Sequence, residues 1–89
     1  MYSPEMETLD QLLGGDMPLT VIRGIYPDEA SFLRGVLALL SSGDVRLLTQ
    51  DNSETPPWRW RELFEEGRVI HDLKEFRLTV SPRGAQRVT

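Results

Sequence analysis

The sequence predicts a small α+β domain, and three observations support this fold class. Residues 29–42 carry apolar side chains at the three- and four-residue spacing of a helix. Residues 44–50 and 76–80 alternate between apolar and polar side chains, as strands do. With 89 residues, of which 39% are hydrophobic and 27% charged, the chain is typical of one folded domain over residues 1–89.

The first part of the chain predicts one short helix and one ambiguous segment. Residues 4–13 have apolar side chains at helical spacing, Ser3 is suited to cap them, and Gly14 follows as a terminator. Residues 19–26 fit a helix by the spacing of their apolar residues and a strand by their β propensity. Both alternatives stay open for this segment.

The helix over residues 29–42 is the element that the pattern indicates most strongly. Asp28 is suited to cap its first turn, and Gly43 to end it in a left-handed conformation. One wide apolar stripe is expected to face the core, and it consists of Phe32, Leu33, Val36, Leu37 and Leu40. We expect this stripe to pack against the strand residues Val45, Leu47, Phe76 and Leu78.

The second part of the chain predicts further short elements. Residues 55–57, a threonine cap followed by two prolines, predict the start of a helix over residues 58–66. Residues 68–73 and 76–80 are expected to pair as a hairpin, and residues 82–88 to form a final helical turn.

This order of elements resembles a winged-helix domain. Residues 39–47, Leu-Leu-Ser-Ser-Gly-Asp-Val-Arg-Leu, resemble the passage from the recognition helix to the first wing strand. Residues 76–84, Phe-Arg-Leu-Thr-Val-Ser-Pro-Arg-Gly, resemble the closing strand of that family. The resemblance implies a small winged-helix-like domain, in which helices precede a short antiparallel sheet and a helix is inserted in the wing connection. It also requires residues 19–26 to be helical.

The composition indicates the cellular compartment in which the protein is expected. Cysteine is absent, which removes disulfides and Cys-based zinc sites and favours a reducing compartment. The N-terminal residues contain neither a basic cluster nor an apolar run, which predicts no secretory signal. The apolar run at residues 36–40 is too short to cross a bilayer. We therefore expect a cytoplasmic protein with no membrane contact.

Catalytic chemistry finds no support in the residue pattern. His71 is the sole histidine, so no second imidazole and no thiolate completes a metal site. The acidic pairs at residues 28–29 and 65–66 are adjacent on helices and point in different directions, which is unsuitable for shared acid-base work. The serines have no paired base, and no glycine-rich phosphate loop occurs. We expect no enzyme activity, no cofactor and no metal.

Two tryptophans alternate with two arginines at residues 58–61. On a helix that begins at Pro57, Trp60 shares one face with the apolar residues 63–64, whereas Trp58 lies about 200° round from Trp60. One hypothesis places both indole rings in the core of an undersized domain. The other exposes Trp58 and makes it available to a partner.

In the second hypothesis Trp58, Arg59 and Arg61 form a partner-binding patch. Tryptophan and arginine contribute a disproportionate share of the energy at protein interfaces. The same side chains are suited to stack on a base or to contact a phosphate. The choice between a protein and a nucleic acid therefore depends on the charge around them.

The net charge is −4, but it is unevenly distributed. Residues 1–57 have three arginines against nine carboxylates, while residues 58–89 have a small basic excess. A nucleic-acid-binding alternative would therefore use the basic side chains Arg34, Arg59, Arg61, Arg77, Arg83 and Arg87 on phosphates. The outward face of residues 29–42 offers only one arginine for reading bases, while Gly35 and Ala38 suggest a close contact with another surface.

These observations favour a non-catalytic interaction module of winged-helix type that binds a protein partner or itself. Its predicted partner-binding residues are Trp58, Arg59 and Arg61. The alternative is a DNA-binding transcriptional regulator that uses arginines, chiefly C-terminal ones, on phosphates. For that alternative the main candidate contacts are Arg34, Arg77, Arg83 and Arg87.

Overall fold

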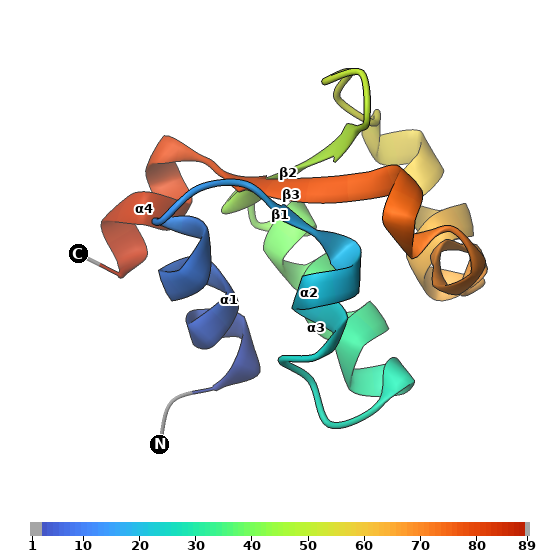
Figure 1. Ribbon diagram of the computed structural model, residues 1–89, viewed down its shortest axis with the longest axis horizontal. Helices are drawn as coiled ribbons and strands as arrows, with labels where there is room; N and C mark the ends of the chain where they lie inside the picture. The colour runs from blue at the N-terminus through green and yellow to red at the C-terminus, as the bar shows by residue number, and fades with distance from the viewer. Residues whose placement is uncertain (1–2, 89) are drawn as a thin grey trace.

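A computed structural model of the protein describes residues 3–88. Met1, Tyr2 and Thr89, which belong to the predicted domain 1–89, lie outside the described residues. In the described part, helices α1, α2 and α3 all lie on one side of a three-stranded antiparallel sheet (Figure 1). The α+β prediction is confirmed, and the arrangement is compatible with a winged-helix-like fold.

The elements follow one another in short segments. In the first half they are α1 (Pro4–Leu12), β1 (Met17–Pro18), α2 (Leu19–Arg23), α3 (Glu29–Ser41) and β2 (Val45–Thr49). In the second half they are η1 (Pro57–Arg59), η2 (Arg61–Glu65), η3 (Arg68–His71), η4 (Leu73–Glu75), β3 (Phe76–Val80) and α4 (Pro82–Arg87). The segments η1, η3 and η4 are 3₁₀ turns, and η2 is a short π-helix.

Strand β3 lies at the centre of the sheet, between β1 and β2. Leu78 is opposite Met17 on one side and opposite Leu47 on the other. The outer edge of β2 is covered by the following loop, because the Thr55 N–H donates to the Leu47 carbonyl at 2.8 Å. The outer edge of β1 carries Pro18, which has no N–H to offer a further strand.

The predicted caps Ser3 and Asp28 are confirmed. The side chain of Ser3 accepts a hydrogen bond from the Met6 N–H at 3.2 Å, and Asp28 accepts one from the Ser31 N–H at 2.7 Å. Ser81 does the same for α4. Gly43 ends α3 with a φ of 81°, a conformation in which a side chain would be strained.

The ambiguous segment 19–26 is helical at Leu19–Arg23. Leu19 and Ile22, three residues apart, are both fully buried. The helical spacing of the apolar residues, rather than their β propensity, therefore predicts the structure of this segment. The strand that pairs at this end of the chain is instead Met17–Pro18, a two-residue element with no pattern long enough to predict it.

The prediction that residues 68–73 form a strand is wrong. They form the 3₁₀ turns η3 and η4, which close through bonds such as that from the Asp72 N–H to the Val69 carbonyl at 2.9 Å. The physical reason is that β1 and β2 already occupy both edges of β3, which leaves no edge for a hairpin partner. Val69 is nevertheless fully buried, so this segment contributes a side chain to the core although it is a helical turn.

The expected threonine cap at residue 55 is also wrong. Its N–H joins the edge of β2, and its buried hydroxyl has no hydrogen-bond partner in the structure. Pro56 directly precedes η1 instead. The predicted helix over residues 58–66 is helical, but it is divided between 3₁₀ and π turns.

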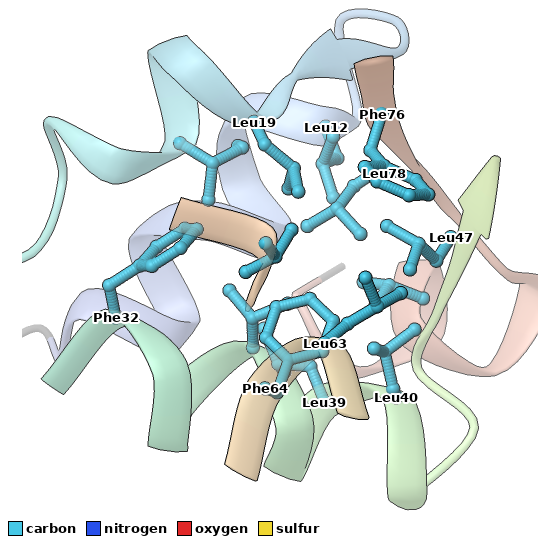
Figure 2. Packing of buried hydrophobic residues seen from close by; sticks show 14 of the residues in the cluster. Leu12, Leu19, Phe32, Leu39, Leu40, Leu47, Leu63, Phe64, Phe76 and Leu78 are labelled. Carbon is cyan, nitrogen blue, oxygen red and sulfur yellow. The ribbon is translucent and has the colours of Figure 1, made fainter. Parts of the chain in front are cut away.

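The core lies between the helices and the sheet (Figure 2). Phe32, Val36 and Leu40 are buried in one cluster with the strand residues, as the stripe predicts. Gly35 and Leu39 are buried as well, whereas Leu33 and Leu37 are only partly buried. The Tyr26 ring packs on Gly35, where an added Cβ would lie 2.5 Å from Tyr26 Cε2. The predicted close contact at Gly35 is therefore made within the chain.

Candidate interaction surface

The two tryptophans of residues 58–61 have different environments. Trp58, on η1, is 76% exposed and is the most exposed of the large hydrophobic side chains described. Trp60 is partly buried, and its indole N–H donates to the Thr55 carbonyl at 3.3 Å. The hypothesis that both rings belong to the core is therefore wrong for Trp58.

The residues after Trp60 anchor this segment on α3. Leu63 and Phe64 are buried in the same cluster as Leu39 and Leu40 of α3, and Figure 2 shows them together. The Phe64 ring is tilted at 53° to the Phe32 ring, with 6.4 Å between the ring centroids. These contacts explain why η2 lies along α3 and why its opposite side faces solvent.

A groove of about 280 Å³ lies between α3 and η2. Its lining is mainly apolar and consists of Ala30, Leu33, Arg34, Leu37, Phe64 and Glu65. Leu33 and Leu37 are the two stripe residues that the core leaves partly uncovered. The sequence analysis assigned both to the core and missed the groove. The signal was available in the width of the stripe, because five apolar positions exceed what one buried face needs.

Charged side chains accompany Trp58 along this surface. Arg61 pairs with Glu65 at 3.3 Å, and Glu62 pairs with Arg68 at 2.7 Å. Arg61 is highly exposed, as a surface patch requires. The candidate surface therefore combines an exposed indole and an ion pair on residues 57–65 with an apolar hollow that α3 and η2 form together.

The predicted nucleic-acid contacts are dispersed over three elements. Arg34 is exposed on α3 beside the groove, and Arg77 of β3 lies 3.7 Å from the Asp16 carboxylate. Arg83 and Arg87 of α4 both approach Asp44, Arg83 at 4.0 Å and Arg87 in direct contact. Three of the four arginines thus face carboxylates of their own chain, which reduces the charge they present to a phosphate.

Asp44 is fully buried at the turn between α3 and β2. One carboxylate oxygen accepts hydrogen bonds from the Ser42 hydroxyl at 2.6 Å and from the Arg87 guanidinium. Its backbone carbonyl accepts the Ser81 N–H at 2.9 Å. These bonds fasten α4 to the turn, so we assign Asp44 to the architecture of the domain.

The ionisable groups with shifted pKa values lie outside the groove lining. Burial raises the pKa of Tyr26 to about 12. The hydrogen bond from the Ser31 backbone lowers the pKa of Asp28. His71 is exposed, and residues 3–88 contain no group of three or more His, Asp or Glu side chains arranged to hold a metal ion. No helix in the same part of the chain has the length and apolar character that crossing a bilayer requires.

Comparisons of the chain with protein-family models, with curated proteins and with solved structures found no match. The winged-helix resemblance therefore stays a prediction about family. The candidate surface is supported by its geometry alone.

Proposed function

We propose that this domain is a non-catalytic interaction module that binds a protein through the groove between α3 and η2 and through Trp58. The observation that carries the proposal is the 76% exposure of Trp58 on the segment that also forms one wall of an apolar groove. A large exposed aromatic side chain beside apolar surface is typical of an interaction site.

The residues of the surface divide into an anchor, a floor and a rim. Trp58 is the anchor, because its ring has most of its area still to bury. Leu33 and Leu37 form the apolar floor with the edge of Phe64. Arginine and glutamate side chains form the polar rim, which in protein interfaces sets orientation more than affinity. Arg34 and Glu65 line the groove, Arg61 pairs with Glu65, and Arg59 lies half-buried on η1 next to Trp58 in the chain.

The charges of this surface favour a protein over a nucleic acid. Glu62 and Glu65 lie on the same short segment as Trp58, and the chain as a whole has a net charge of −4. Carboxylates beside the anchor would repel a phosphate backbone, whereas a protein partner can offer its own cations. Among residues 3–88, three of the four arginines proposed for DNA face carboxylates of their own chain, which does not favour that alternative.

Peptides selected from a random display library against the immobilised domain test the proposal. Isothermal titration should give a Kd for each selected peptide that rises about 10-fold or more in Trp58→Ala and in Leu37→Ala. Val21→Ala is the matched control, because Val21 is 45% exposed and does not line the groove. Peptides whose Kd is unaffected by both groove-side changes would place the binding surface elsewhere.

A further inference from the structure

We draw no further inference here: the strongest candidate, the apolar groove between α3 and η2 that Leu33, Leu37 and Phe64 line, carries none, because nothing in the structure shows what covers it.

Discussion

Helix α4 and the η1–η2 segment close the domain at opposite ends, and they do so by different physics (Figure 1). Helix α4 is held by polar bonds: Asp44 accepts from Arg87, and the Ser81 hydroxyl donates to the Gly43 carbonyl at 2.6 Å. The η1–η2 segment is held by apolar contacts through Leu63 and Phe64.

This difference separates architecture from function. A buried carboxylate is costly unless it is paired, so Ser42 and Arg87, which bond one Asp44 oxygen, are committed to the fold. The other oxygen, Oδ1, has no hydrogen-bond partner in the structure. Apolar packing needs no specific partner for each atom. Segment η2 can therefore bury Phe64 while the groove beside it stays open. We therefore expect substitutions at the α4 end to affect stability and exposed substitutions at the η1 end to affect binding.

The largest effect is expected for Leu40→Ala. Leu40 is buried in the core that both ends share, so its truncation should lower the free energy of unfolding by about 2–5 kcal/mol. Leu37→Ala should cost well under half as much, because Leu37 is only partly buried at the groove. Urea denaturation of both variants measures the difference. Equal losses would mean that Leu37 belongs to the core and that the groove is not a separate surface.

Gly84→Ala tests the polar closure directly. An added Cβ on Gly84 would overlap the Asp44 carbonyl oxygen, which is backbone and cannot turn aside. Overpacking of this kind costs about 1–3 kcal/mol. Ala85→Gly in the same helix serves as a control for propensity alone. If Gly84→Ala melts like the wild type, α4 is less tightly fastened than its hydrogen bonds indicate.

Much of the fold could be predicted from the sequence, because the informative signals are local. A cap such as Asp28, the 3.6-residue spacing of α3 and the alternation in β3 each act within one element. The pairing of β3 depends instead on which edges other segments occupy. Residues 68–73 were expected to be a strand for that reason, and the competing two-residue β1 is too short to carry a pattern.

The candidate surface was half predictable. The distance of Trp58 round a helix from Trp60 indicates that one partner of the pair must leave the core, and the structure exposes Trp58. The width of the apolar stripe indicates a surplus of apolar residues, but the position of the groove could not be predicted, because it depends on which stripe residues tertiary packing covers. In the structure the Tyr26 ring packs on Gly35 of α3, while Leu33 and Leu37 are only partly buried.

Alkaline pH should destabilise the core near Tyr26 and leave the packing of α4 on Asp44 unaffected. Burial raises the Tyr26 pKa from 10.0 to about 12, so the folded state disfavours the phenolate. The neutral ring contributes its full stability below pH 10, and that contribution is lost as the pH rises towards 12. Urea denaturation at both ends of this range should show a steeper loss for the wild type than for Tyr26→Phe. Parallel losses would show that other groups dominate.

Duplex DNA should bind weakly and without using α4. Because Arg83 and Arg87 face Asp44, replacing them with alanine should leave the salt dependence of any binding unchanged. Each phosphate contact contributes about 0.9 to the slope of log K against log salt. Fluorescence anisotropy at several salt concentrations measures that slope. A slope that flattens by about one for each arginine removed would support the DNA-binding regulator over the interaction module.

The smallest effect on stability is expected for Trp58→Ala, and it makes the sharpest comparison. Trp58 is 76% exposed, so its removal should change the free energy of unfolding by no more than about 0.5 kcal/mol. Trp60→Ala removes a partly buried ring and its bond to the Thr55 carbonyl, and it should cost clearly more. The two variants remove the same chemical group two residues apart, so each controls for the other. Thermal melts of the two variants and the wild type measure the difference. Equal melting temperatures below that of the wild type would mean that Trp58 is held by the core in solution, and the surface built on its exposure would then be wrong.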